Sequence, residues 1–104
     1  MSGANGMPAP AEIIMLLPNG IEIPRVEHDE FRREVEDALR WLPYGVSCRI
    51  EHLVRPRFWL PKSARQRRLL GRCLAYWVAN GELPLEFVGP RRATNKRYRR
   101  RPNT

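Results

Sequence analysis

Residues 63–81 read SARQRRLLGRCLAYWVANG and carry the strongest secondary-structure signal in the chain. Ser63 with Gln66 three residues later is the pattern of a capping box, in which two side chains satisfy backbone N–H groups at a helix start. Asn80-Gly81 is a typical helix stop, because both residue types tolerate the left-handed backbone that ends many helices. The stretch therefore predicts a helix that starts at Ser63 and stops at Asn80-Gly81.

This predicted helix has two chemically different sides. At 100° per residue, an apolar stripe falls on one side and a basic stripe on the other. Ala75 and Ala79 lie beside the basic stripe and would let a partner approach the backbone closely, although alanine is also the best helix former. The apolar side comprises Leu70, Cys73, Leu74, Trp77 and Val78, and the other side comprises Arg65, Arg68, Arg72 and Tyr76.

A second amphipathic helix is expected over residues 29–42. Asp29 can cap its start, and Pro43 forces its stop. The outer face mixes both charges, as an ordinary solvated surface does, so this helix is interpreted as scaffold. Its apolar positions recur at the spacing of one helix face and are Phe31, Val35, Ala38, Leu39 and Leu42.

The segment between these helices is harder to assign. Residues 47–54 have near-helical apolar spacing and a candidate cap in Ser47, which favours a short helix. A strand stays open there, because the run is short and rich in branched residues. Residues 55–61 contain two prolines and should form a turn that Phe58 and Trp59 pin to the core. All three tryptophans, Trp41, Trp59 and Trp77, are assigned to packing.

Strands are expected at both ends of the domain. Asn19-Gly20 between apolar runs predicts a β-hairpin over residues 12–24. Residues 13–17 are apolar without alternation, so this strand should be covered on both faces, by a second subunit or by the domain's own helices. At the other end, we expect a strand over residues 83–88, a basic loop over 89–95, a return strand over 96–99 and a frayed end from Arg99 onward.

Charge is divided between the two halves of the chain. Residues 1–54 carry five Lys/Arg against nine Asp/Glu, a net charge of −4, whereas residues 55–104 carry fourteen against two, a net charge of +12. A concentrated basic surface gains free energy by releasing the counterions condensed on a polyanion, so the pattern favours nucleic-acid binding. The alternative is a solubilising surface with a basic tail.

The order helix, short helix, turn, helix and basic hairpin over residues 29–100 resembles the winged helix-turn-helix DNA-binding domains, and Leu70-Gly71-Arg72 with the following residues looks like small accessory regulators of bacteria, phages and plasmids. The resemblance implies a third helix in the major groove and a hairpin wing on the backbone or minor groove. The implied nucleic-acid-binding residues are Lys62, Arg65, Arg68, Arg72, Tyr76, Arg91, Arg92, Lys96 and Arg97. The hairpin over residues 12–24 and the long segment between the second and third helices depart from the family's pattern.

The expected fold class is therefore α+β: a winged-helix-like three-helix core with a C-terminal β-hairpin wing and an added N-terminal β-hairpin. Residues 11–100 should form this single domain, with a flexible leader over 1–10 and a basic tail over 101–104. We expect a cytoplasmic protein without a signal peptide, because the leader lacks a basic start and a long apolar run, and no stretch is long and apolar enough to span a membrane.

The sequence favours a sequence-preferring binder of double-stranded DNA, a small transcriptional regulator or recombination accessory factor, dimeric through the N-terminal hairpin. The alternatives are a mobile-element-encoded inhibitor that docks a macromolecular partner, or an RNA-binding protein. No enzyme is expected, because the chain contains no G-x-S-x-G, P-loop or H-E-x-x-H motif. No metal or other cofactor is expected either, because the spacing of Cys48, His52, Cys73 and His28 matches no strong metal signature, and both cysteines are interpreted as core residues.

Overall fold

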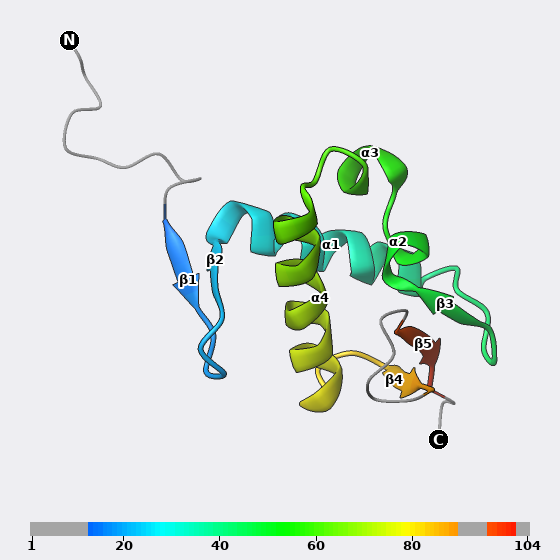
Figure 1. Ribbon diagram of the computed structural model, residues 1–104. Helices are drawn as coiled ribbons and strands as arrows, with labels where there is room; N and C mark the ends of the chain where they lie inside the picture. Colours follow the sequence, from blue (N-terminus) through cyan, green and yellow to red (C-terminus); the bar gives the residue numbers. More distant parts are fainter. Residues whose placement is uncertain (1–12, 90–95, 102–104) are drawn as a thin grey trace, which may run out of the picture.

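The computed structural model describes residues 13–89 and 96–101, and within them the chain is an α+β fold with four helices and two small antiparallel sheets (Figure 1). The predicted leader over residues 1–10, Arg91, Arg92 and residues 102–104 of the predicted tail lie outside these ranges. The elements in chain order are β1 (Ile14–Leu16), β2 (Glu22–Pro24), α1 (Arg25–Leu39), β3 (Ser47–Arg49), α2 (Ile50–Leu53), α3 (Pro56–Trp59), α4 (Ala64–Ala79), β4 (Leu85–Val88) and β5 (Arg97–Arg100).

The three-stranded sheet gathers segments that are far apart in sequence. Its strand order is β3-β5-β4, so the last strand lies between the other two, and both pairings are antiparallel. Tyr98 on β5 is opposite Cys48 on β3 and Phe87 on β4, and its side chain is buried. The strand that follows the predicted basic loop is therefore the central strand of the sheet, and its Tyr98 belongs to the core.

Helix α4 has the boundaries and the faces that its sequence predicts. The Gln66 backbone N–H donates to the Ser63 hydroxyl at 3.1 Å, and the Ser63 backbone N–H donates to the Gln66 side chain at 2.8 Å, which completes the capping box. Gly81 takes a φ of +70° just past the helix end. Of the predicted apolar side, Leu70, Cys73, Leu74 and Trp77 are buried and Val78 is partly buried.

An aromatic cluster joins α1, α3 and α4. The Phe31 ring stacks on Trp77 with centroids 5.4 Å apart and on Phe58 at 5.9 Å. Trp59 is also buried, so the segment after α2 is pinned to the core as predicted. The assignment of Trp41 to packing was wrong, because this side chain follows α1 in a turn and is 62% exposed.

Helix α1 begins four residues before the expected start. Pro24 is its N-cap, because the fixed proline φ, here −55°, suits a helix entry and proline has no N–H to leave unpaired. Asp29 is therefore an interior residue, and its carboxylate contacts His28 Nδ1 at 2.9 Å and Arg25 Nε at 3.9 Å. The helix ends at Leu39, ahead of the predicted stop.

The short helix predicted over residues 47–54 is divided in two. Ser47–Arg49 form strand β3, because β5 supplies hydrogen-bond partners that cannot be foreseen from local spacing, and helix α2 starts only at Ile50. Within residues 55–61, Pro56 begins the one-turn helix α3. The open strand interpretation of this segment was therefore correct for its first part.

The N-terminal hairpin is present, but it is not covered on both faces by the domain's own helices. Leu17 is buried and Met15 packs on the core, whereas Ile14 and Leu16 on the other face of β1 are 54% and 68% exposed. Coverage by a second subunit stays a prediction. At the other end, the frayed segment was placed too early: Arg99 and Arg100 belong to β5, and the Arg101 N–H donates to the Pro84 carbonyl at 2.8 Å.

The ion pair between Glu34 and Arg55 ties α1 to the start of α3 and should make stability depend on pH. The Arg55 guanidinium donates to Glu34 Oε2 at 2.7 Å, and this hydrogen bond lowers the pKa of Glu34 below its ordinary value of 4.5. Because the folded-state pKa is depressed, the stabilisation is complete above pH 4.5 and is lost as the pH falls through the folded pKa.

We expect Glu34→Gln to reduce the loss of stability on acidification, measured by urea unfolding between pH 6 and pH 3. Glu30→Gln is the control, because Glu30 lies on the same helix, is exposed and makes no ion pair with a described residue. Identical pH profiles for Glu34→Gln and the intact chain would contradict the assignment.

Candidate functional site

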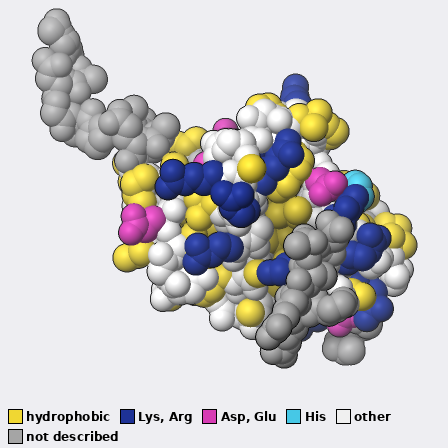
Figure 2. Space-filling view, in the orientation of Figure 1, with side chains coloured by type: hydrophobic (Ala, Val, Ile, Leu, Met, Phe, Trp, Pro, Cys, Tyr) yellow, Lys and Arg dark blue, Asp and Glu magenta, His cyan; other side chains and the backbone are white. Residues whose placement is uncertain are grey.

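Basic side chains gather on one face of the protein. Figure 2 shows Lys and Arg side chains over α4 and over the neighbouring sheet, with apolar side chains between them. Arg65, Arg68 and Arg72 of α4 are exposed, and none of them has a carboxylate of the described residues within 4.0 Å. Three positive charges on one helix therefore remain available to an external anion.

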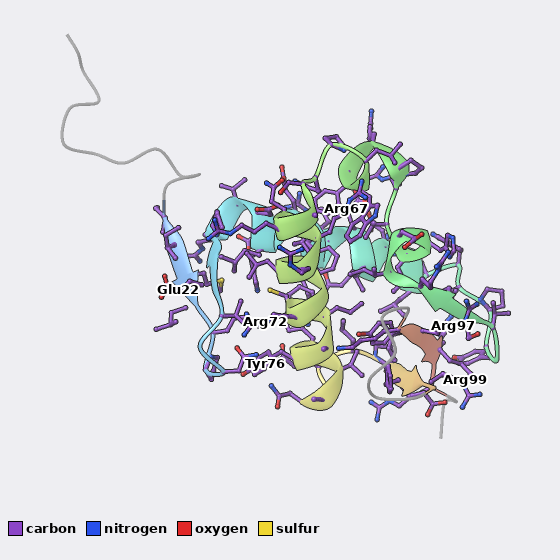
Figure 3. All side chains as sticks on the ribbon, in the orientation of Figure 1. Glu22, Arg67, Arg72, Tyr76, Arg97 and Arg99 are labelled. Atoms are coloured by element: carbon purple, nitrogen blue, oxygen red, sulfur yellow. The ribbon has the colours of Figure 1, made fainter. Side chains whose placement is uncertain are left out.

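Tyr76 continues this face toward the end of α4. Figure 3 shows Arg67, Arg72 and Tyr76 on successive parts of α4, with Arg97 and Arg99 on the sheet beside it. The Tyr76 side chain is only half-buried and packs against the core cluster. It occupies the edge between the core and the basic face, where its hydroxyl can still reach a ligand.

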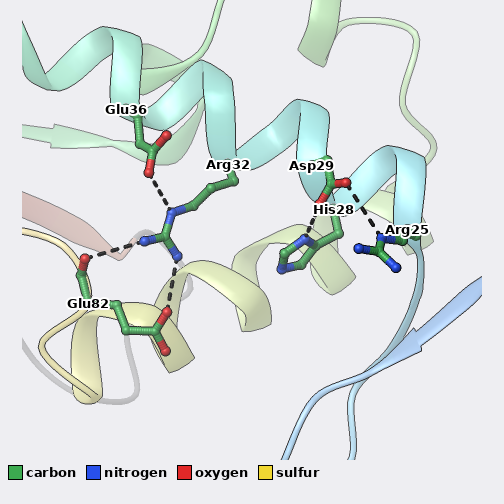
Figure 4. Close-up of polar contacts among 6 residues, drawn as sticks. All are labelled: Arg25, His28, Asp29, Arg32, Glu36 and Glu82. Atoms are coloured by element: carbon green, nitrogen blue, oxygen red, sulfur yellow. Dashed lines mark hydrogen bonds and ion pairs between the residues drawn. The ribbon is translucent and has the colours of Figure 1, made fainter.

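Arg32 of α1 contrasts with the three exposed arginines of α4, because its charge is neutralised within the chain. Arg32 donates to Glu36 at 3.0 Å and to Glu82 at 3.1 Å (Figure 4). Its guanidinium also lies 4.9 Å from the centroid of the Trp77 ring. The unpaired positive charge of α4 is therefore a property of its position in the fold and not of arginine content alone.

Lys62 does not join the basic face. Its ammonium lies 3.3 Å from Glu27 Oε2 and 4.5 Å from the centroid of the Phe58 ring, and its side chain is 18% exposed. Lys62, which the sequence predicted to bind nucleic acid, thus lies in the contact between α1 and α3. Sequence spacing could not reveal this, because Glu27 lies 35 positions earlier.

The sheet contributes fewer available charges than the sequence predicts. Arg97 donates through Nε to the Ser47 hydroxyl and through Nη2 to the Ser47 carbonyl, both at 3.0 Å, which fixes β5 on β3. Arg99 pairs with Glu86 at 2.6 Å. Lys96 is exposed and lies next to α4, while Arg91 and Arg92 lie outside the described residues.

A groove of about 440 Å³ separates α4 from the sheet. Arg68 and Arg72 of the predicted site line it, and so does Lys96. Two further arginines were missed in the sequence: Arg49, because its segment was interpreted as a helix, and Arg67, because it lies on the flank of α4 between the basic and apolar sides. The groove is lined by Arg49, Ile50, Glu51, Trp59, Arg67, Arg68, Gly71, Arg72, Lys96 and Tyr98.

The groove continues along α4 as a smaller, more apolar hollow. This second hollow has a volume of about 250 Å³ and shares Lys96 and Tyr98 with the first. Its α4 wall consists of Ala75, Val78 and Ala79, and Phe87 of β4 closes it. The small side chains noted in the sequence thus border this hollow, on the flank of α4 that faces the sheet.

The two cysteines have the properties of core residues. Both are buried and neither forms a disulfide. Burial raises the pKa of the Cys73 thiol to about 11 and also raises that of Cys48. Residues 13–89 and 96–101 contain no group of three or more His, Cys, Asp or Glu side chains arranged to hold a metal ion.

Comparison with known protein families, curated proteins and solved structures found no match to this chain. None of the helices in the described part of the chain is long and apolar enough to cross a membrane.

Gly71 is the feature of the groove that packing within the chain does not explain. It lies inside α4, where glycine destabilises a helix by about 0.5–1 kcal/mol relative to alanine. A Cβ at this position would meet no atom within 4 Å. The described residues therefore leave room for a side chain that the sequence does not supply.

We expect Gly71→Ala to raise the free energy of unfolding by about 0.5–1 kcal/mol, measured by urea denaturation, because it adds helix propensity without a clash. Gly81→Ala is the opposite control: Gly81 has a φ of +70°, which strains alanine, so stability should fall. A loss of stability in Gly71→Ala would mean that the backbone of α4 is packed more closely there than the structure indicates.

Proposed function

We propose that the protein binds double-stranded DNA through the basic face of α4. The observation that carries the proposal is the exposed set Arg65, Arg68 and Arg72, which has no carboxylate partner among the described residues although most other arginines are paired or hydrogen-bonded. An arginine already paired with a carboxylate would gain little free energy by moving to a phosphate. An unpaired arginine can neutralise a phosphate and release the counterions condensed on the DNA.

The chain connectivity supports a winged-helix arrangement. Helix α1 is followed by β3, the short helices α2 and α3, the long helix α4 and the pair β4 and β5, with strand order β3-β5-β4. In the winged helix-turn-helix domains that the sequence resembles, the helix before the hairpin enters the major groove. Here that helix is α4, and the segment between β4 and β5 would be the wing.

The chemistry of the basic face fits a duplex. Residues three and four apart share one side of a helix, so Arg65, Arg68 and Arg72 present their guanidinium groups along one line. Arginine can donate two hydrogen bonds to guanine O6 and N7 or to a phosphate. Base contacts would give sequence preference and phosphate contacts would give position on the duplex.

Removing two of these charges should weaken duplex binding and its salt dependence. We expect Arg65→Gln/Arg68→Gln to lower the affinity for a selected duplex site at least about tenfold and to reduce the slope of log K against log salt by about 2. The measurement is fluorescence anisotropy of a labelled duplex at several salt concentrations.

The matched control is Arg40→Gln/Arg57→Gln. It removes the same charge from two exposed residues outside α4 that form no ion pair with a described residue. Equal losses in the two variants would show a diffuse electrostatic effect and refute the α4 interface. Tighter binding of structured RNA than of duplex DNA would move the proposal to RNA.

We further propose that two copies pair through β1. The Leu17 N–H donates to the Ile21 carbonyl and the Arg25 N–H to the Ile13 carbonyl, both at 2.8 Å. Hydrogen-bonded pairs alternate along an antiparallel ladder, so the backbone groups of Ile14 and Leu16 point away from β2, toward an edge that no described strand covers. Antiparallel pairing of this edge with a second copy would satisfy these groups and bury both exposed side chains.

We expect sedimentation equilibrium to show a dimer that Leu16→Lys converts to a monomer, because a charge on an edge strand blocks pairing. Leu60→Lys is the matched control, since Leu60 is 69% exposed and lies in the turn after α3. A monomeric intact chain would remove the dimer from the proposal and leave the α4 interface untouched.

One observation favours a second candidate, a module that docks another protein. Trp41, Tyr44 and Val46 lie close together in sequence before β3 and are 62%, 50% and 47% exposed. Tryptophan and tyrosine often dominate the binding energy of protein interfaces. Weak duplex binding together with a stoichiometric protein partner that Trp41→Ser releases would favour this candidate over DNA binding.

A further inference from the structure

The groove beside α4 combines an apolar interior with a basic rim. Arg49, Arg67, Arg68, Arg72 and Lys96 surround it, and among the described residues of its lining Glu51 is the one acidic side chain. Glu51 already lies 3.4 Å from the Arg49 guanidinium, so it offsets part of only one of the five charges. An anion entering the groove would therefore meet a net positive wall.

The arginines of the rim also have hydrogen-bonding capacity that the chain does not use. The Nε atoms of Arg49 and Arg67 are buried without a hydrogen-bond partner. Arg67 is oriented by its Nη2 group, which donates to the Trp59 and Leu60 carbonyls at 3.3 and 3.2 Å. Unpaired buried donors are costly, so two arginines beside the groove have hydrogen-bonding capacity that the described residues do not meet.

The interior of the groove is suited to more than a phosphate. Ile50, Trp59 and Tyr98 contribute apolar and aromatic surface, and Gly71 keeps the α4 wall open. A bare phosphodiester would gain nothing from this apolar surface, whereas a nucleobase would bury a planar apolar face in it. The volume of about 440 Å³ lies in the range of small-ligand sites.

Arg68 and Arg72 connect the groove to the basic face. Both line the groove, and both belong to the exposed row with Arg65, which does not line it. A phosphate held by Arg68 or Arg72 from outside would have its nucleoside at the mouth of the groove. The two regions can therefore bind adjoining parts of one strand.

We propose that this groove binds a single nucleoside phosphate, with the base on the apolar interior and the phosphate on the basic rim. The nucleotide comes either from the unpaired end of a strand whose duplex lies on α4, in which case the inference rests on the proposed function, or from a free nucleotide. Gly71 keeps open the space that the base occupies.

The test compares a blunt duplex with the same duplex carrying a single unpaired nucleotide, using anisotropy with the intact chain, Gly71→Ala and Gly71→Leu. The Leu side chain would fill the groove, whereas the Ala side chain would leave most of it open. We expect the unpaired nucleotide to increase affinity about tenfold in the intact chain and in Gly71→Ala, and to give no increase in Gly71→Leu. The readout is the ratio of the two affinities within each protein, so a change in blunt-duplex affinity does not enter it.

A second arm titrates 2′-deoxyadenosine 5′-monophosphate and follows amide chemical shifts. Shifts in the intact chain that are absent in Gly71→Leu, without any gain from the unpaired end, would support the groove with a free nucleotide as the source. Ala75→Leu, which fills the adjoining hollow and not the groove itself, is the matched control and should keep both responses, and thermal melting checks that each variant is folded.

The inference is overturned if folded Gly71→Leu retains the preference for the unpaired nucleotide and the chemical-shift changes, if Ala75→Leu loses them as fully as Gly71→Leu does, or if the intact chain shows neither. A failure of the proposed function is distinct from both results. It would show as absent blunt-duplex binding in the intact chain, whatever the nucleotide arm gives.

Discussion

The packing of Trp77 determines how the basic helix is presented. Its indole is 1% exposed, stacks on Phe31 of α1, and meets the His28 ring edge-on with centroids 5.3 Å apart. The Arg32 guanidinium, held by Glu36 and Glu82, covers it from the α1 side. Since residues 72 and 77 lie on nearly opposite sides of a helix, burying Trp77 against α1 turns Arg72 outward. The packing of Trp77 thus determines that the positively charged side of α4 is exposed.

The distribution of carboxylates completes this division of charge. Six of the nine acidic residues in residues 1–54 lie on α1. Three of them, Glu27, Glu34 and Glu36, each hold a basic residue, from α3 or its flanks or from α1 itself. The two acidic residues of the second half are also engaged, Glu82 with Arg32 and Glu86 with Arg99. Little negative charge is left near α4, so its arginines keep their potential and pay no cost of breaking ion pairs when an anion binds.

Local signals in the sequence were sufficient for α4, because capping, a 3.6-residue period and a glycine stop all act within one turn or two. The start of α1 was predicted wrongly because Asp29 also suits a cap, and only the geometry at Pro24 decides between the two. Strand β3 was only the second alternative for its segment, because Tyr98, the pairing partner of Cys48, is 50 positions away. Long sequence separation also limited the prediction of the site. Arg68 and Arg72 could be found from helical spacing, whereas the groove forms only when α2, β3 and β5 are assembled around α4.

The composition of α4 shows how a binding surface is reconciled with stability. Gly71 weakens the middle of the helix by up to about 1 kcal/mol, and three nearby arginines repel one another. The capping box at Ser63 contributes about 1 kcal/mol in the opposite direction, and Leu70, Cys73, Leu74 and Trp77 bury the whole inner side. The N-terminal cap and the buried inner face thus stabilise the helix. The residues of the outer face and of the groove flank are therefore free to serve ligand binding. An open glycine position and unpaired arginines persist on this helix because its stability does not depend on them.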